Sequence, residues 1–394
     1  MILAVVALIV TTWLDKSNKE AERTFREAEA ARKEATETAE RNRLDILQRQ
    51  QQRTHELDVM AKYLPYLTHE NEEIRFSAVQ TIRILASTEI ATLVAKIDPS
   101  PGKTAALIAA ASTTTDANER AQLVEALGTI VSGRPAFIVQ NNRPTGFRSS
   151  QWENVIAKYS SMIEAVCRST GRIEVVGHPQ GLEWVGTGWV AHGTSIVLPR
   201  YVLETVAMED PEDGWVFRKQ SGSDKPIKVS IDFGEELNGP SYTYELGSIK
   251  YVGETTDDRY ALAIVEVIDL DESAHPPIPM QLEPLLTVSG TEVAVVGYPA
   301  LDLRKPPEVI KSVFGEVFDV KRVMPGKLVA IDDDSGAPIV MHDCSTLGGT
   351  GGAPLLDLAS GKVIGVHVAS LYLKEATAAA TWKLNNALSR LPNE

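Results

Sequence analysis

The residues best suited to chemistry lie close together in the segment 342–370, HDCSTLGGTGGAPLLDLASGKVIGVHVAS. This segment combines hydroxyl groups with imidazoles, at Ser345, Thr346, Thr350, Ser370, His342 and His367. A hydroxyl attacks a carbonyl carbon when an imidazole takes its proton, and a carboxylate keeps that imidazole in the required tautomer. Peptide hydrolysis by this mechanism therefore requires that all three groups occupy the right positions.

Metal and cofactor chemistry has no comparable signal in the chain. The seven histidines are dispersed, and neither His-Glu-x-x-His nor Cys-x-x-Cys occurs. No phosphate-binding loop or dinucleotide fingerprint is present. We therefore expect no metal and no cofactor. The two cysteines, Cys167 and Cys344, are too few for a disulfide framework and fit a reducing compartment.

The charge of the chain limits its partners. The 394 residues have a formal net charge of −14, and 43% of them are hydrophobic, which is enough for a sizeable core. Between Asp15 and Lys62, eleven acidic and eleven basic side chains cancel, so the excess negative charge lies downstream. An acidic body without a Lys/Arg stripe repels a phosphate backbone, so we expect no nucleic-acid partner. A basic protein or peptide is compatible with this charge.

Residues 1–14 are the one candidate for a membrane anchor. Ile2 to Leu14 is a run of apolar residues and threonines with Trp13 at its polar edge. The run is shorter than the roughly 20 residues that span a bilayer, and it lacks the basic start and cleavage site of a signal peptide. Basic residues follow at once, which by the positive-inside rule places the body in the cytoplasm. The alternative is the start of a soluble helix in a soluble cytoplasmic protein.

Residues 15–60 predict one long charged helix. They contain no Gly or Pro and consist mostly of good helix formers, with acidic and basic residues four apart, such as Glu22 and Arg26. The apolar face is thin until Leu44, Leu47, Leu57 and Met60, so a strong coiled coil is not indicated. We expect a stalk, through which the chain could form a homo-oligomer.

Residues 61–132 predict further helices. Apolar residues recur at helical spacing from Ile74 to Leu85, and Asn71 is a suitable N-cap. A second helix is predicted over Ala121 to Ile130, with Pro99, Pro101 and Gly102 breaking the chain between the two. This pair resembles one HEAT-like repeat. A single such unit cannot bury both of its faces and must pack on something else.

The pattern changes downstream of residue 132. Residues 133–160 predict a linker rich in Gly, Pro, Asn and Arg, followed by a helix. Residues 161–394 contain short runs of Val, Ile, Leu and aromatic residues separated by Gly, Pro and Asp, which is typical of an all-β barrel. The fold class is therefore multidomain, with an α-helical N-terminal half and an all-β C-terminal domain.

Four segments of this β-rich half resemble trypsin-like (chymotrypsin-fold) serine peptidases, in particular the bacterial members with short loops. They are Gly186–Val206, Arg259–Val267, Val293–Pro299 and His342–Ser370. The last contains GTGGAP where the family has a Gly-Asn/Asp-Ser-Gly-Ser/Gly-Pro turn. The resemblance covers roughly residues 162–387 and implies a double β-barrel.

The resemblance also implies where the catalytic side chains should be, and each position lacks its group. The nucleophile position falls on Gly351. The base position falls on Tyr201 if one residue is deleted, or on Val202 without a gap. The carboxylate position falls on Ala261, although a shift in register could bring Asp257 or Asp258 there.

The backbone part of the site does not depend on these side chains. An oxyanion hole is built from N–H groups, which the resemblance assigns to Gly349 and Gly351. A displaced nucleophile would have to be Thr350 or Ser345, with Ser370 as a further hydroxyl, and each would need a positioned base. His192, His342 and His367 do not fall on the base position, so we expect that role to be vacant.

The sequence therefore predicts a catalytically inactive serine peptidase homologue, or pseudoprotease. We expect it to act as a binding or regulatory module, with a protein or peptide partner in the former substrate cleft and a tether to the cytoplasmic side of a membrane. Two alternatives stay open. One is an active serine-type endopeptidase with a rearranged site, and the other is a membrane-anchored oligomeric scaffold.

Overall fold

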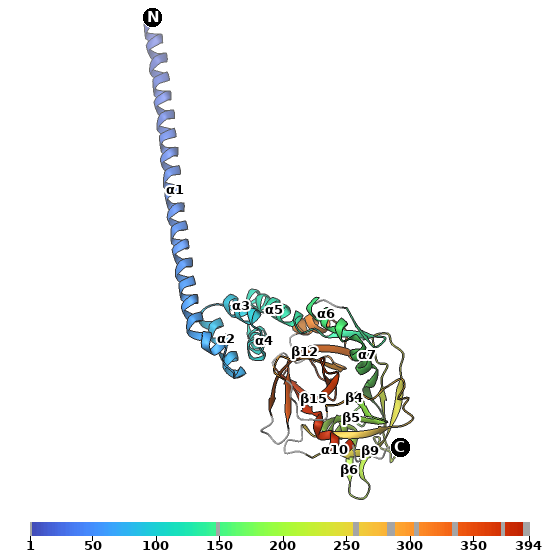
Figure 1. Ribbon diagram of the computed structural model, residues 1–394. Coiled ribbons are helices and arrows are strands. Elements are labelled where there is room, and N and C mark those ends of the chain that lie inside the picture. Colours follow the sequence, from blue (N-terminus) through green and yellow to red (C-terminus); the bar gives the residue numbers. More distant parts are fainter. Residues whose placement is uncertain are drawn as a thin grey trace. The chain divides into compact units, whose positions relative to one another are not determined.

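The computed structural model describes residues 2–146, 150–254, 260–281, 288–302, 307–332, 338–371 and 375–388. They form two compact units, one comprising residues 1–64 with 85–87 and the other residues 65–84 with 88–394. Helices occupy the N-terminal part of the chain, and two antiparallel β-barrels follow (Figure 1). The predicted fold class is thereby confirmed.

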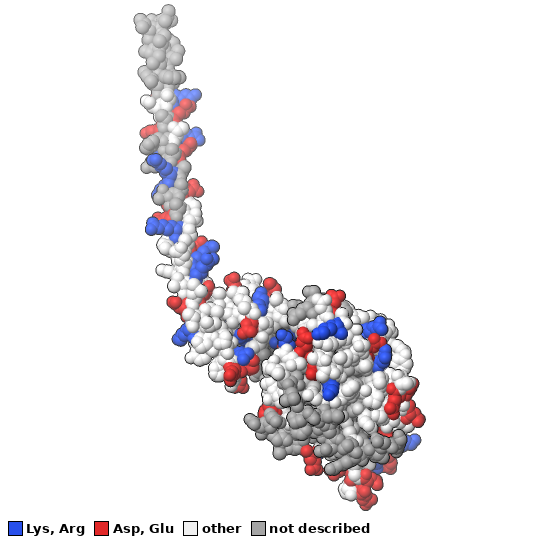
Figure 2. All heavy atoms as spheres, in the orientation of Figure 1, with Lys and Arg blue, Asp and Glu red and all other residues white. Residues whose placement is uncertain are grey.

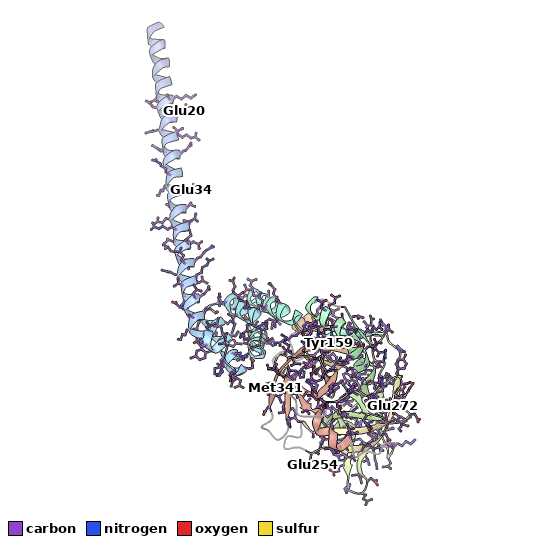
Figure 3. All side chains as sticks on the ribbon, viewed as in Figure 1. Glu20, Glu34, Tyr159, Glu254, Glu272 and Met341 are labelled. Carbon is purple, nitrogen blue, oxygen red and sulfur yellow. The ribbon has the colours of Figure 1, made fainter. Side chains whose placement is uncertain are left out.

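A single helix, α1 (Ile2–Leu67), accounts for most of the first unit. Exposed ion pairs four residues apart, such as Arg26 with Glu22, lie along it, and each stabilises a helix by about 0.2–0.5 kcal/mol. Charges of both signs therefore line its surface (Figure 2), and side chains such as Glu20 and Glu34 extend from it (Figure 3). The helix continues beyond the predicted end at residue 60 and ends two residues after Pro65.

The predicted anchor coincides with the first turns of α1. Met1 lies outside the described residues, and the backbone from residue 2 to residue 14 is helical. Across the described ranges, no helix has both the length and the apolar content needed to cross a bilayer.

Four helices open the second unit: α2 (Glu72–Leu85), α3 (Thr88–Ile97), α4 (Pro101–Thr113) and α5 (Ala117–Ser132). Their interior includes the fully buried Ile82, Leu107 and Leu123. Asn71 caps α2 as predicted, since its Oδ1 accepts a hydrogen bond from the Glu73 N–H at 2.8 Å.

Pro99 lies in the break between α3 and α4, and Pro101 starts α4, a helix that was not predicted. Pro101 lies in the first turn, where a missing N–H costs nothing, and the Ser100 side chain accepts a hydrogen bond from the Lys103 N–H.

The segment predicted as a linker contains a hairpin. Strands β1 (Phe137–Gln140) and β2 (Arg143–Thr145) pair with each other, and β1 also pairs with β12 (Arg322–Asp332). Asn141 and Asn142 form its turn with φ of 53° and 63°, a conformation that Asn tolerates and that a tight hairpin requires. Composition suggested a loop because turn residues flank strands of only four and three residues. Helices α6 (Ser150–Lys158) and α7 (Ser160–Ser169) follow.

The first barrel closes in the order β10-β5-β4-β3-β8-β9. Its strands are β3 (Thr170–Val176), β4 (Trp184–His192), β5 (Ser195–Pro199), β8 (Lys228–Asp232), β9 (Thr243–Val252) and β10 (Leu262–Val267). Helix α8 (Arg200–Val206) begins directly after β5, and a separate hairpin joins β6 (Ala207–Asp210) to β7 (Gly214–Phe217). Branched side chains such as Ile173, Ile196 and Val265 fill its interior.

The second barrel closes in the order β11-β14-β15-β16-β13-β12. Its remaining strands are β11 (Glu292–Gly297), β13 (Ile339–His342), β14 (Pro354–Asp357), β15 (Lys362–Leu371) and β16 (Glu375–Ala380). Helix α9 (Pro307–Phe314) packs on α5, and η2 (Thr381–Leu384) with α10 (Asn385–Leu388) ends the described chain. The four segments that carried the family resemblance lie on β4, β5, β10, β11 and β13 to β15.

Candidate functional site

Two of the predicted catalytic positions meet where the barrels face each other. Gly351 belongs to the turn 349–352 that leads into β14 of the second barrel, and Tyr201 lies in the first turn of α8 on the first barrel. A Cβ added to Gly351 would overlap the Tyr201 hydroxyl oxygen and lie 3.2 Å from its Cζ. Val202, the other candidate for the base position, is 2% exposed and packs in the core of the first barrel. The side chain that faces the nucleophile position is therefore that of Tyr201.

Tyr201 cannot take the proton of a nucleophile. Its hydroxyl donates a hydrogen bond to the Val368 carbonyl oxygen at 2.8 Å. Desolvation of this hydroxyl raises its pKa to about 12, although 39% of the residue is exposed, so the phenol stays protonated at physiological pH. A general base must be able to accept a proton near the working pH. Tyr201 instead acts as a fixed donor to β15.

The residue at the predicted carboxylate position, Ala261, carries no acid. Ala261 is fully buried, and its carbonyl oxygen accepts a hydrogen bond from the Arg200 N–H at 2.8 Å. This contact places Ala261 beside the start of α8, where a carboxylate would have to lie to orient an imidazole at position 201. The alternative acids, Asp257 and Asp258, lie outside the described residues.

The glycine turn contains two residues in the left-handed region of backbone conformation. Gly349 and Gly352 have φ of +82° and +97°, and an added Cβ would overlap the Trp184 ring at the first and the Thr187 carbonyl at the second. Thr187 of β4 makes two hydrogen bonds to this turn. Its N–H donates to the Gly351 carbonyl oxygen at 2.9 Å, and its hydroxyl donates to the Gly349 carbonyl oxygen at 3.0 Å. Among the described residues the N–H groups of Gly349 and Gly351 have no acceptor, so both are available to a bound oxygen.

Thr187 is a functional residue that we did not single out from the sequence. It lies in the motif Gly-Thr-Gly-Trp of β4, which carried part of the family resemblance. Its hydrogen bonds to the glycine turn join residues more than 160 positions apart in the chain, so no local sequence pattern reveals them.

The substitute nucleophiles are not activated. Thr350 is fully buried, and its Oγ1 has no hydrogen-bond partner among the described residues. Ser345 is 1% exposed and donates its hydroxyl proton to the Arg134 carbonyl oxygen at 2.7 Å. Ser370 Oγ lies 3.4 Å from the Thr346 carbonyl oxygen. Within the described ranges, none of these hydroxyls is hydrogen-bonded to an imidazole.

The two imidazoles of this region bond to each other instead. His342 Nε2 and His367 Nδ1 are 3.2 Å apart, and both residues are buried. Burial lowers both pKa values, that of His367 to about 3, so the pair is neutral at physiological pH. His192 is exposed at the end of β4. The structure therefore brings no histidine to the base position.

A cavity of about 450 Å³ adjoins the turn. Its walls include Tyr201, Gly348, Gly349, Val368 and Ser370. His367 is hydrogen-bonded to the backbone of Gly352 and Ala353, just before β14. On the cleft side of β15 after His367, the one backbone hydrogen bond among the described contacts runs from the Tyr201 hydroxyl to the Val368 carbonyl oxygen. Among the described residues, the cleft therefore combines backbone N–H groups that have no acceptor with a strand edge, and no hydroxyl there is hydrogen-bonded to an imidazole.

The described residues contain no group of three or more His, Cys, Asp or Glu side chains arranged to bind a metal ion. Cys167 and Cys344 are both free and buried, and burial raises the pKa of each thiol. Neither thiol is therefore disposed to act as a nucleophile.

Residues 224–366 match the family model of the trypsin-like peptidase domain. Two solved structures of the Rv3671c protease from M. tuberculosis are similar to the chain. The active form is 18% identical, with 64% of this chain and 92% of that chain covered at a TM-score of 0.39. The inactive form is 18% identical, with 60% and 94% covered at a TM-score of 0.37. No curated protein matches the chain.

Proposed function

We propose that this chain, whose C-terminal half contains a trypsin-like peptidase domain, is a pseudoprotease that binds a protein or peptide segment without cleaving it. One observation supports this most directly. The nucleophile position is Gly351, and the hydroxyl of Tyr201 occupies the space that a side chain there would need. Removing a triad member leaves only roughly 10³ to 10⁴-fold catalysis over water, and here all three are absent.

The features that remain in the cleft suit binding. The glycine turn offers two N–H groups, and β15 presents a strand edge at residues 368–370 beside a cavity of about 450 Å³. An extended segment can add to such an edge through main-chain hydrogen bonds, with alternate side chains in the adjoining cavity. With a net charge of −14 on the chain, a basic segment is the favoured partner.

The helical half is proposed to position this module. Residues 1–14 would anchor the chain to a membrane with its body on the cytoplasmic side, and the α1 stalk would allow self-association through its exposed Leu44, Ile46, Leu47 and Leu57. The segment 61–132 would act as a HEAT-like spacer. The charge and apolar pattern of the first 67 residues supports this arrangement.

Labelling with a fluorophosphonate probe, which reacts with activated serine, tests the absence of activity. The full chain is compared with Gly351→Ser/Tyr201→His/Ala261→Asp, and with a control in which Gly351→Ala replaces Gly351→Ser. We expect labelling of the first variant alone. Labelling of the unmodified chain would overturn the proposal in favour of an active endopeptidase, and Thr350→Val and Ser345→Ala would then identify its nucleophile.

Peptides selected from a displayed random library test binding with the same protein. Gly348→Trp should abolish binding, because an added Cβ there meets nothing within 4 Å and the indole fills the cleft. Gly128→Trp on α5, where a Cβ also meets nothing, is the matched control. Equal affinity of the two variants would contradict binding in the cleft and favour the oligomeric scaffold.

A further inference from the structure

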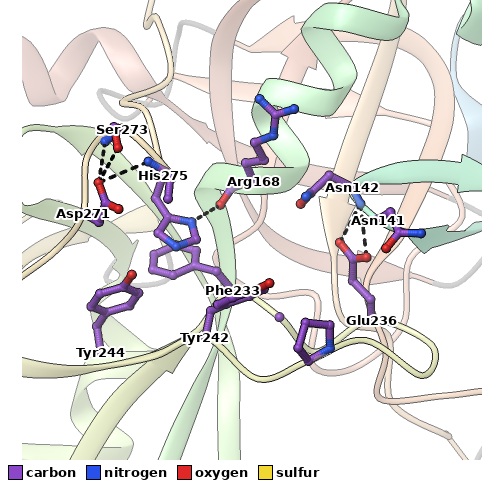
Figure 4. Close-up of a pocket in the computed structure, with 13 residues that line it drawn as sticks. Asn141, Asn142, Arg168, Phe233, Glu236, Tyr242, Tyr244, Asp271, Ser273 and His275 are labelled. Atoms are coloured by element: carbon purple, nitrogen blue, oxygen red, sulfur yellow. Dashed lines mark hydrogen bonds between the residues drawn. The ribbon is translucent and has the colours of Figure 1, made fainter.

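A second recess lies at one end of the first barrel, where the β1–β2 hairpin packs against it (Figure 4). Its volume is about 510 Å³. The walls come from the hairpin turn, the end of α7, the β8–β9 connection and the turn after β10. The hairpin and α7 precede residues 224–366, which match the peptidase family. This aromatic pocket therefore includes walls from outside that matched region.

Aromatic rings form one side of the aromatic pocket. Phe233 stacks on His275 with ring centroids 4.2 Å apart, and Tyr244 meets the same imidazole edge-on at 5.3 Å. The Tyr242 ring lies 6.3 Å from His275, and 51% of this residue is exposed. Tyr242 and Tyr244 are two residues apart on an extended chain, so both rings face the pocket. The faces of such rings attract cations.

The charges around the aromatic pocket leave one carboxylate without a cation. Glu236 accepts two hydrogen bonds of 3.1 Å from the Asn142 N–H and lies 3.5 Å from Lys321 Nζ. Arg168 is paired with Glu164. Asp271 accepts hydrogen bonds from Ser273 and Ala274, and no ion pair joins it to a cation among the described residues. Asp271 therefore gives the rim of the pocket an uncompensated negative charge.

His275 adds an acceptor to the same wall. Its Nδ1 lies 2.8 Å from the Arg168 carbonyl oxygen, so Nδ1 must be the donor, and burial lowers the pKa of the ring. The neutral ring then presents a lone pair at Nε2. That atom is buried and has no hydrogen-bond partner in the described part of the chain.

We propose that the aromatic pocket binds an arginine side chain of a partner protein, independently of the cleft. The guanidinium lies against the rings of Tyr242 and Tyr244 and donates N–H groups to the Asp271 carboxylate. Arginine fits this combination better than lysine, because its planar group stacks on aromatic faces and carries five N–H donors in a fixed fork.

Calorimetric titration of the full chain tests the proposal. The probe is acetyl-Gly-Gly-Arg-Gly-Gly-amide, and its control contains citrulline, the neutral isostere, in place of arginine. We expect the arginine peptide to bind at least about tenfold more tightly than the citrulline peptide. Tyr242→Ala and Asp271→Asn should each weaken binding about threefold to thirtyfold. Tyr251→Ala, an exposed tyrosine elsewhere on β9, should leave it unchanged.

Equal binding of the arginine and citrulline peptides, or no binding of the arginine peptide in the millimolar range, would overturn the proposal. An equally strong lysine peptide would overturn the assignment to arginine, and an effect of Tyr251→Ala as large as that of Tyr242→Ala would place the site elsewhere. Gly348→Trp, which fills the cleft, should not affect this binding, so failure of the cleft proposal and failure of this one are distinguishable.

Discussion

The cleft and the aromatic pocket of the barrel domain differ in what the chain provides. In the cleft the proposed binding groups are backbone N–H groups, while the positions predicted for reacting side chains are Gly351, Tyr201 and Ala261. In the aromatic pocket the side chains supply the rings and the charge. Gly349 and Gly352 are required by packing against Trp184 and Thr187, whatever happens at position 351. The presence of the glycine turn is therefore evidence of the fold and not of activity.

The largest effect should come from placing a side chain where the turn requires glycine. Gly352→Ala should lower the free energy of unfolding by about 3 kcal/mol or more, because a Cβ at φ +97° overlaps the Thr187 carbonyl and neither backbone can move aside easily. Gly348→Ala in the same loop should change it by less than about 0.5 kcal/mol, since nothing lies within 4 Å. Urea denaturation measures the free energy of unfolding of both variants. Similar losses in the two would show that packing against Thr187 does not require glycine at position 352.

The buried imidazoles beside the cleft should make the domain sensitive to acid. His342 and His367 remain neutral when folded, with the pKa of His367 lowered to about 3, while an unfolded histidine binds a proton below roughly pH 6.5. Their stabilisation is thus complete above that pH and is lost as the pH falls below it, for His367 down to about pH 3 and by at most about 1.4 kcal/mol per pH unit.

Denaturation at a series of pH values measures this slope. His367→Gln should reduce the slope of the free energy of unfolding between pH 6 and pH 4. An unchanged slope in His367→Gln would mean that the pair takes up a proton in the folded state.

A smaller effect should link the vacant nucleophile position to the tyrosine that faces it. Gly351→Ala forces the Tyr201 hydroxyl off Val368 O and should cost about 1–2 kcal/mol, and Tyr201→Phe alone should cost about 1 kcal/mol for the lost hydrogen bond. In the double variant the nearest ring atom is Cζ, 3.2 Å from the new Cβ. The double variant should therefore lose about 0.5–1.5 kcal/mol less free energy of unfolding than the sum of the two single variants. Additive losses would contradict a contact between Gly351 and Tyr201.

Much of the fold was predictable because the signals are local. The helix over residues 15–60 follows from composition, and the strands around Gly186, Ala263 and Gly349 follow from motifs of a few residues each. Helix α4 was missed because Pro101, a residue type that usually interrupts a helix, here occupies the first helical turn. The β1–β2 hairpin was missed because strands of four and three residues give too short a pattern, and their pairing with β12 lies some 180 residues away.

The amino-acid sequence by itself determined that Gly351 and Ala261 have no reactive group, since this depends only on residue type and motif spacing. The tertiary structure alone decided that Tyr201, and not Val202, faces Gly351. It also decided that the buried hydroxyls of Thr350 and Ser345 have no hydrogen bond to an imidazole among the described residues, and that the aromatic pocket exists. Each of these depends on contacts between residues remote in the chain, such as Tyr201 with Val368 and His275 with Arg168. Such contacts form only when the two barrels and the preceding hairpin pack together, so no local pattern contains them.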